Sequence, residues 1–447
     1  MGTKSKRREK ETSIWKKIAR GNGFFFKNTD AYDIIAAEAD TAARFGNTNC
    51  TGRTGDARGT TRRMNHNVYR NESARPVCTG LWGAQKARSE CEKAWQHVLC
   101  ALFARRPPPV WRGDRAKPDG AGKTVVFAEF HGEATKAEVF AHMDACKAAG
   151  CDAVIGMGGG KVIDTAKTVA ENLGGLPCII IPTVASNDAP CSGVAVLYNE
   201  QGVVVKAVMM RRNPDLVLVD TEILSKAPAR LLSAGMGDAL STWFEAEACR
   251  KNGVKTMARG QETETVAMMS RLCYDLLLRY GSEALDGVKR GEYTPALEKV
   301  VEANILLSGV GFESGGLAAA HAINDGFAQE PQAHGMYHGE KVAFGVLTQL
   351  VLQKTDAQTL EEVLGFLARV ELPMTLAQLG ITEIREETLR KVAEAACVPT
   401  QSTKTCPPIL RRRTCTRRFW KRTGSVGSTW RAETNRGHGG AAPFHVP

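Results

Sequence analysis

The chain has 447 residues, of which 43% are hydrophobic, and this length is sufficient for two domains with a sizeable core. No apolar run approaches the roughly 18–20 residues that cross a membrane, and the basic N-terminus lacks the apolar segment of a secretory signal. The 13 cysteines include no CxxC pair, which argues against a disulfide framework and against a zinc ribbon. We therefore expect a protein without a membrane span in a reducing compartment, the cytoplasm.

The formal net charge of +11 is distributed unevenly along the chain. Residues 121–400 are net acidic, whereas residues 1–120 and 401–447 carry the excess of Lys and Arg and every tryptophan except Trp243. Neither flank shows sustained helical or strand periodicity. Two interpretations stay open: disordered basic arms that bind nucleic acid or an anionic membrane, or flanks translated out of frame around an enzyme core. The second is favoured, so we expect no nucleic-acid partner.

The first half of the acidic middle alternates strand-like and helix-like patterns. Such alternation predicts an α/β fold with a parallel sheet and a ligand at the carboxyl ends of its strands. The predicted strands cover residues 123–130, 153–155, 178–181, 194–198 and two runs within 203–220, and the predicted helices cover residues 136–150, capped by Gly150, and a segment that opens at Lys161.

The predicted turn at residues 156–160 joins a strand to a helix through glycines. Glycine lets the backbone approach an anion, and the free N–H groups at a helix N-terminus favour negative charge, so this turn is a candidate phosphate site. It lacks the spacing of the GxGxxG fingerprint, and no Ser or Thr follows Lys161 as a P-loop requires. As a pattern alone it indicates a turn more often than a phosphate site.

After residues 220–228 the sequence changes to long amphipathic helices, which continue to about residue 400. Asp238 lies early on a helix of small residues, and His321 and His338 lie on two apolar runs joined by a short polar connection. A helical hairpin can bring two imidazoles together as half of a metal site. The alternative is that His321 is a core histidine, His334 and His338 are surface residues, and Asp238 is a cap.

Five motifs occur in order within residues 123–400: GMGGGKVIDTAK, IPTVASNDAPCS, GMGDALSTWFEA, GVGFESGGLAAAHAI and YHGEKVAFG. Together they closely resemble the glycerol dehydrogenases of the iron-containing (metal-dependent) alcohol dehydrogenase family. The resemblance implies a dehydroquinate-synthase-like architecture and a homo-oligomer. It divides the chain into an atypical flank (1–120), an α/β Rossmann-like NAD-binding domain (121–222), an all-helical metal- and substrate-binding domain (223–400) and an atypical tail (401–447).

The resemblance also implies the site residues. Asp238, His321 and His338 would be the metal ligands and would contact the substrate, whereas His334 is not at a ligand position. One carboxylate and two imidazoles leave coordination open, which suits catalytic Zn²⁺, with Fe²⁺ as the alternative. Asp188 of SNDAP would hydrogen-bond the polyol. The implied NAD-binding residues are Gly158, Gly159, Gly160, Lys161, Asp164, Thr165, Thr183, Ser186, Ser192, Val194 and Tyr198.

The implied reaction is NAD-dependent oxidation of glycerol to dihydroxyacetone by metal-assisted hydride transfer, with a small polyol as the partner. One alternative is a related vicinal-diol or alcohol dehydrogenase of the same family. Another is an inactive pseudoenzyme whose basic arms bind nucleic acid or a membrane.

The chain departs from the family pattern in three places. Asn324 and Asp325 stand where the family usually has His-Asn. No first βα unit of the NAD domain is recognisable in residues 60–120, and the terminal helices expected after Cys397 are not recognisable either. The sequence therefore predicts an intact site on an incomplete scaffold.

Overall fold

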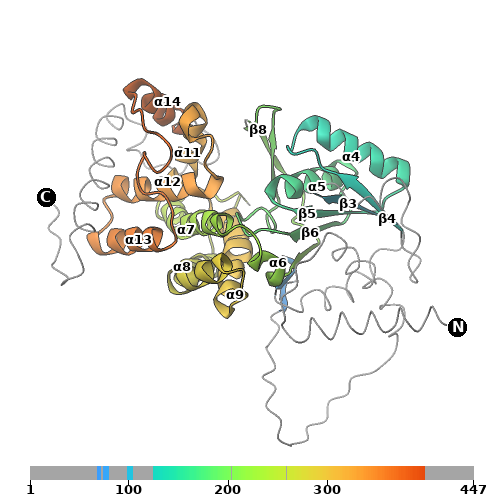
Figure 1. The fold of residues 1–447 in the computed structure, drawn as a ribbon, viewed down its shortest axis with the longest axis horizontal. Coiled ribbons are helices and arrows are strands. Elements are labelled where there is room, and N and C mark those ends of the chain that lie inside the picture. Colours follow the sequence, from blue (N-terminus) through green and yellow to red (C-terminus); the bar gives the residue numbers. More distant parts are fainter. Residues whose placement is uncertain are drawn as a thin grey trace, which may run out of the picture.

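The protein's structure is a computed structural model that describes residues 68–71, 74–79, 98–103, 124–202, 204–257 and 259–397. An α/β part extends to residue 219, and a helical part beginning at residue 221 lies beside it (Figure 1). Within these ranges, no helix has the length and hydropathy needed to cross a bilayer. The predicted tail at 401–447 and most of the predicted flank at 1–120 lie outside the described residues.

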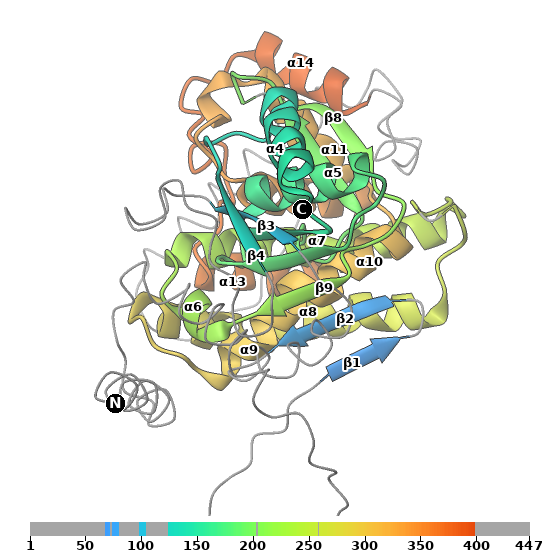
Figure 2. The same ribbon diagram turned by 90° about the vertical axis from the view of Figure 1, so that its right-hand side faces the viewer.

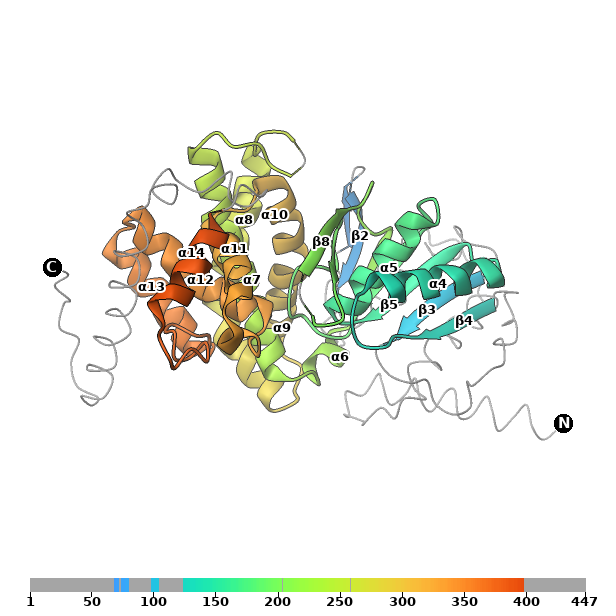
Figure 3. The same cartoon turned by 90° about the horizontal axis from the view of Figure 1, so that it is seen from above.

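The α/β part is built on a seven-stranded sheet with the strand order β1-β2-β9-β6-β5-β3-β4. Every neighbouring pair in this sheet is parallel except β1 with β2. A separate antiparallel hairpin, β7 with β8, lies between the sheet and the helical part (Figures 1 and 3). The strands are β1 Val68–Asn71, β2 Ala74–Thr79, β3 Val98–Phe103, β4 Thr124–Glu129, β5 Ala153–Gly158, β6 Cys178–Pro182, β7 Val194–Tyr198, β8 Val204–Met209 and β9 Leu216–Val219.

Two helices, α4 (Lys136–Ala149) and α5 (Gly160–Asn172), lie on the same side of this sheet (Figure 2). The Thr135 hydroxyl caps α4 by accepting the Glu138 N–H at 3.1 Å, and Gly150 ends the helix with φ +66°. β6 is buried along its whole length, as expected for a parallel strand covered on both faces. The predicted strands at 123–130, 178–181 and 194–198 and the predicted helix at 136–150 are thus confirmed.

The glycine turn is shorter than the sequence analysis predicted. β5 continues through Gly158 and α5 begins at Gly160, so a single residue links the strand to the helix. A Cβ at Gly156 would lie 2.7 Å from the Ala166 Cβ, and one at Gly158 would lie 2.8 Å from a Val162 methyl. These two glycines therefore allow α5 to pack closely on β5, and a side chain at either position would push the helix away.

The described residues of the flank 1–120 form three strands, β1, β2 and β3, where the sequence shows no strand pattern. β3 pairs in parallel with both β4 and β5, and β2 pairs in parallel with β9. Part of this flank therefore belongs to the sheet, although no first βα unit is recognisable in its sequence. β1 and β2 are short and contain Arg, Asn and Pro. Their pairing, rather than their own pattern, defines them as strands, because β2 pairs with the distant β9 and β1 pairs with β2.

The helical part is arranged around α7 (Ala229–Lys251), which packs against α8, α10 and α12. The pattern change predicted at 220–228 falls between β9 and α7, where the chain passes from sheet to helices. The other helices are α6 Thr221–Ser225, α8 Glu264–Lys289, α9 Pro295–Val301, α10 Ser308–Gly315, α11 Ala319–Gly326, α12 His338–Gln353, α13 Ala357–Arg369 and α14 Glu386–Ala396, with a π-helix η2 Glu302–Leu307 and 3₁₀ turns η3 Phe327–Gln329 and η4 Pro331–Ala333.

Glycines allow α7 to approach its neighbours closely. A Cβ at Gly339, the second residue of α12, would lie 1.8 Å from the Ala234 carbonyl oxygen of α7. A Cβ at Gly235 would lie 1.9 Å from the Ala185 carbonyl oxygen, which also accepts a hydrogen bond from the Asn304 amide at 3.0 Å. The start of α12 and the loop after β6 are therefore both held against α7.

Candidate metal centre and active site

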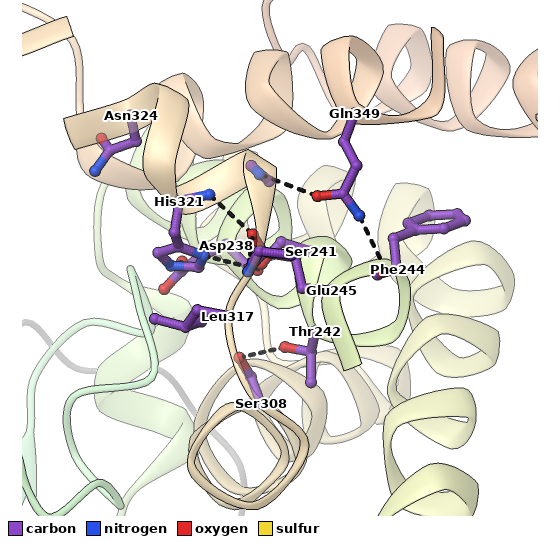
Figure 4. A network of polar contacts seen from close by, with 12 residues as sticks. Asp238, Ser241, Thr242, Phe244, Glu245, Ser308, Leu317, His321, Asn324 and Gln349 are labelled. Carbon is purple, nitrogen blue, oxygen red and sulfur yellow. Dashed lines mark hydrogen bonds and ion pairs between the residues drawn. The ribbon is translucent and has the colours of Figure 1, made fainter. Parts of the chain in front are cut away.

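Asp238, His321 and His338 meet where α7, α11 and α12 come together. Asp238 is 1% exposed, His321 lies inside α11, and His338 is the first residue of α12. The Asp238 Oδ1 lies 3.4 Å from the His321 Nε2 and 3.2 Å from the His338 Nε2 (Figure 4 shows Asp238 and His321). Among the described residues, this is the one group of at least three His, Cys, Asp or Glu side chains whose ligand atoms lie within 4.8 Å of one another.

This group fits a divalent metal ion. Both oxygens of the Asp238 carboxylate are buried, and neither accepts a hydrogen bond, which is costly unless a cation is present. Two ligand atoms that each lie about 2.0–2.1 Å from a tetrahedral Zn²⁺ are separated by about 3.3 Å. The observed separations of 3.2 and 3.4 Å agree with that value. One carboxylate and two imidazoles also leave an open coordination position, as catalytic zinc sites do.

The electrostatic environment of Asp238 also favours a bound cation. Burial alone would raise the pKa of Asp238, but the His338 and His321 rings outweigh it, so the pKa of this carboxyl lies well below its usual range. Burial lowers the pKa of His321, but the carboxylates of Glu245 and Asp238 outweigh it and hold that pKa well above its usual range. The site therefore attracts positive charge to the position between these side chains.

Glu245 is a site residue that the sequence analysis missed. It is fully buried on α7, and its Oε2 lies 2.6 Å from the His321 Nδ1 (Figure 4). A signal was available, because Glu245 follows Asp238 by seven residues, which is about two helical turns and therefore the same face of α7. No local pattern could reveal its partner, since His321 lies 76 residues further along the chain.

Asp188 reaches the same region from the loop after β6. Its Oδ2 accepts a hydrogen bond from the Ser308 hydroxyl at 3.1 Å, and the Ser308 hydroxyl lies 3.0 Å from the Thr242 hydroxyl of α7. Since a carboxylate only accepts, Ser308 donates to Asp188 and Thr242 donates to Ser308. Burial, and then the neighbouring Asp238 carboxylate, raise the pKa of Asp188 well above its usual range. Asp188 and Asp238 thus act on each other electrostatically within one site.

Five of the predicted cofactor residues lie at the carboxyl ends of β5 and β6, namely Gly158, Gly159, Gly160, Lys161 and Thr183, whereas Val194 and Tyr198 lie on β7. The Thr183 N–H donates to the Gly158 carbonyl at 3.0 Å, which fixes the two strand ends against each other. The Lys161 Nζ lies 5.9 Å from the centre of the Tyr198 ring and 2.6 Å from a Glu133 carboxylate oxygen. Lys161 is the second residue of α5, directly after the predicted turn, and it forms an ion pair with Glu133.

Three of the predicted cofactor residues use their side chains within the protein. The Asp164 Oδ1 lies 3.2 Å from the Nζ of the buried Lys167. The buried Thr165 hydroxyl donates to a backbone carbonyl of its own helix at 2.9 Å, and Ser192 is 2% exposed. These three side chains hold the loop and helix in place. The remaining predicted residues, Ser186 and Val194, are partly exposed.

Asn324 and Asp325, the departures from the family pattern, follow His321 on α11. The Asn324 side chain is buried and donates to an Asp325 carboxylate oxygen at 3.2 Å. Asp325 is four residues after His321 and thus lies on the same face of α11. The departure therefore leaves the three ligand positions unchanged and adds a carboxylate one turn from His321. His334 forms a hydrogen bond with the Ala328 carbonyl at 3.3 Å and lies outside the group of Asp238, His321 and His338.

Comparisons with known proteins agree with this geometry. A family model for iron-containing alcohol dehydrogenases matches residues 116–221. A glycerol dehydrogenase of Escherichia coli O6:H1 is 48% identical over 287 residues, which cover 64% of this chain and 78% of that protein.

Two solved structures are similar to this fold. The glycerol dehydrogenase of Schizosaccharomyces pombe gives a TM-score of 0.70 at 33% identity, over 79% of this chain and 89% of that one. A probable glycerol dehydrogenase of Sinorhizobium meliloti gives 0.69 at 36% identity, over 76% of this chain and 94% of that one. The chain therefore belongs to the iron-containing alcohol dehydrogenase family and, within it, is most plainly similar to glycerol dehydrogenases.

Proposed function

We propose that the protein oxidises glycerol to dihydroxyacetone with NAD⁺, at a divalent metal held by Asp238, His321 and His338. One observation carries the proposal above all others. A buried carboxylate without a hydrogen bond faces two imidazole nitrogens at 3.2 and 3.4 Å, beside the meeting point of the α/β and helical parts. The names of the relatives support glycerol as the substrate.

The protein side chains would position the metal and the substrate for the reaction. When bound, the metal supplies Lewis acidity, which lowers the pKa of the substrate hydroxyl that is oxidised. NAD supplies the hydride acceptor. Asp238, His321 and His338 hold the metal with an open position, and burial of Asp238 keeps water from weakening the electrostatic attraction. We propose Zn²⁺ as the metal, because two imidazoles and one carboxylate suit it, with Fe²⁺ as the second choice.

Asp188 would select the substrate. Its carboxylate is fixed by Ser308, and it can accept a hydrogen bond from a second hydroxyl next to the reacting carbon. An alcohol without that second hydroxyl cannot make this additional hydrogen bond, which disfavours its binding. Asp188 thus supports vicinal diols over simple alcohols.

We further propose that residues 121–222, together with the strands before them, form the NAD-binding domain and that residues 223–400 form the metal- and substrate-binding domain. Gly158, Gly159, Gly160 and Lys161 would hold the pyrophosphate at the N-terminus of α5. Thr183, Ser186, Val194 and Tyr198 would line the rest of the cofactor site, while Asp164, Thr165 and Ser192 would support it. We also propose a cytoplasmic homo-oligomer.

An NAD⁺ reduction assay tests this function. With glycerol or 1,2-propanediol the enzyme is expected to form NADH, and with 1-propanol it is expected to form far less. Only the first two carry a second, neighbouring hydroxyl that can donate a hydrogen bond to Asp188. A chelator should remove the activity and added Zn²⁺ should restore it. NADH formation that persists at the full rate in metal-free protein would contradict the proposal. Equal rates with 1-propanol would instead indicate a related alcohol dehydrogenase.

A further inference from the structure

We propose that Glu245 is the positioning residue of the metal site, which it acts on by fixing both the ring and the backbone of His321. This inference rests on the proposed metal site and deepens it. The two oxygens of one buried carboxylate have separate partners (Figure 4). Oε2 lies 2.6 Å from the His321 Nδ1, and Oε1 accepts the N–H groups of Ala318 at 2.9 Å and His321 at 3.0 Å.

The backbone contacts matter because α11 has no capping side chain of its own. Ala318 precedes the helix, and alanine cannot accept the free N–H groups of a first turn. Two buried side chains from other helices accept them instead. Glu245 of α7 takes two, and the Gln349 Oε1 of α12 takes the Ala320 N–H at 3.0 Å. The Gln349 amide is itself held by donating to the Phe244 carbonyl at 3.0 Å.

The ring contact matters because it determines which nitrogen can bind the metal. A carboxylate only accepts hydrogen bonds, so the His321 Nδ1 must carry the proton that it shares with Glu245. In the neutral ring the lone pair is then on Nε2, the nitrogen that faces Asp238 at 3.4 Å. Such a partner both orients a ligating imidazole and makes its other nitrogen more basic. Glu245 therefore orients the His321 ring so that Nε2, rather than Nδ1, is the nitrogen that faces the metal position.

A glutamine at position 245 cannot do both tasks. Its amide has one accepting oxygen and one donating nitrogen, whereas Glu245 accepts at both ends. If the nitrogen faced the His321 Nδ1, the ring proton would be forced to Nε2, where it blocks the metal. If the nitrogen faced the N–H groups of Ala318 and His321, donors would face donors and the start of α11 would shift. Either outcome weakens metal binding.

Gln349 provides a matched control. It caps the same helix at the adjacent N–H group and is equally buried, but no contact joins it to the imidazole in the described structure. Gln349→Leu therefore removes capping without changing the tautomer of His321. If Glu245 acted only as a cap, the two variants would behave alike.

The test is Zn²⁺ affinity of the full chain, measured by competition with a chromophoric chelator. It is combined with ¹⁵N NMR of the histidine rings in metal-free protein, at a pH high enough for the His321 ring to be neutral. Glu245→Gln is expected to weaken Zn²⁺ binding about 10–100-fold, with a changed His321 tautomer if its amide nitrogen faces the ring. Gln349→Leu is expected to leave the tautomer unchanged and to weaken Zn²⁺ binding less than Glu245→Gln does, because it removes only a helix cap. Where Glu245→Gln does not fold, Glu245→Asp gives the same comparison, because its shorter carboxylate cannot reach both partners.

Two results would overturn the proposed role of Glu245 and leave the proposed metal site intact. One is a Glu245→Gln protein that folds and binds Zn²⁺ as tightly as the wild type. The other is a Gln349→Leu protein that loses as much affinity as Glu245→Gln, with the same tautomer in both. A wild-type protein that binds no Zn²⁺ would overturn the proposed metal site itself, and Glu245 with it.

Discussion

Asp238→Asn is expected to abolish stoichiometric zinc binding and to lower the rate of glycerol oxidation by about 10³-fold or more, since a Lewis acid contributes several kcal/mol to such a step. Asparagine has the same shape as aspartate but no charge. Both Asp238 oxygens are buried without a hydrogen bond, so the charge is what the substitution removes. Zinc per chain, by elemental analysis, and the rate of NADH formation are the measurements.

Asp275→Asn is the control for Asp238→Asn. Asp275 also lies on a long helix, α8, but its side chain is 50% exposed and pairs with Arg271. Exposed ion pairs contribute little, so this variant should keep both its zinc and its activity. An Asp238→Asn protein that retains one zinc per chain would remove Asp238 from the ligand set.

Gly339→Ala is expected to lower the free energy of unfolding by about 3 kcal/mol, the upper end of the usual range for overpacking, because the added methyl group meets backbone rather than a movable side chain. That methyl group would lie 1.8 Å from the Ala234 carbonyl oxygen, so α12 must move away from α7. His338 is the residue before Gly339, and Zn²⁺ binding should weaken as well. Urea denaturation measures the stability change.

The control here is Gly335→Ala, in the connection before α12. A Cβ at Gly335 has no atom within 4 Å, so the variant should be as stable as the wild type. Equal stability of Gly339→Ala and the wild type would show that the close approach of α7 and α12 is not required.

The proximity of Asp238, His321 and His338 could be predicted from the sequence because these residues lie in the ordered motifs that resemble a known family, and the structure brings them together. Strands β4, β6 and β7 could be predicted because each is a continuous apolar run with turn residues on both sides. These features depend on residues that are adjacent in the sequence.

Other features depend on contacts far apart in the sequence, which explains why they were missed. β2 contains Arg75 and Pro76 and becomes a strand through its pairing with β9, more than a hundred residues later. Gly156 and Gly158 indicate a turn, yet they remain in β5 because α5 packs against them. Glu245 looks like an ordinary helical carboxylate until α11 is placed beside it.

Anomalous X-ray diffraction at the zinc edge, from crystals of the zinc-loaded protein, tests most directly whether Asp238, His321 and His338 share one metal ion. We predict a single strong peak about 2.0–2.2 Å from an Asp238 carboxylate oxygen and from the Nε2 atoms of both histidines. A zinc peak bound by other residues, with none between these three, would contradict the metal centre and the proposed reaction that depends on it.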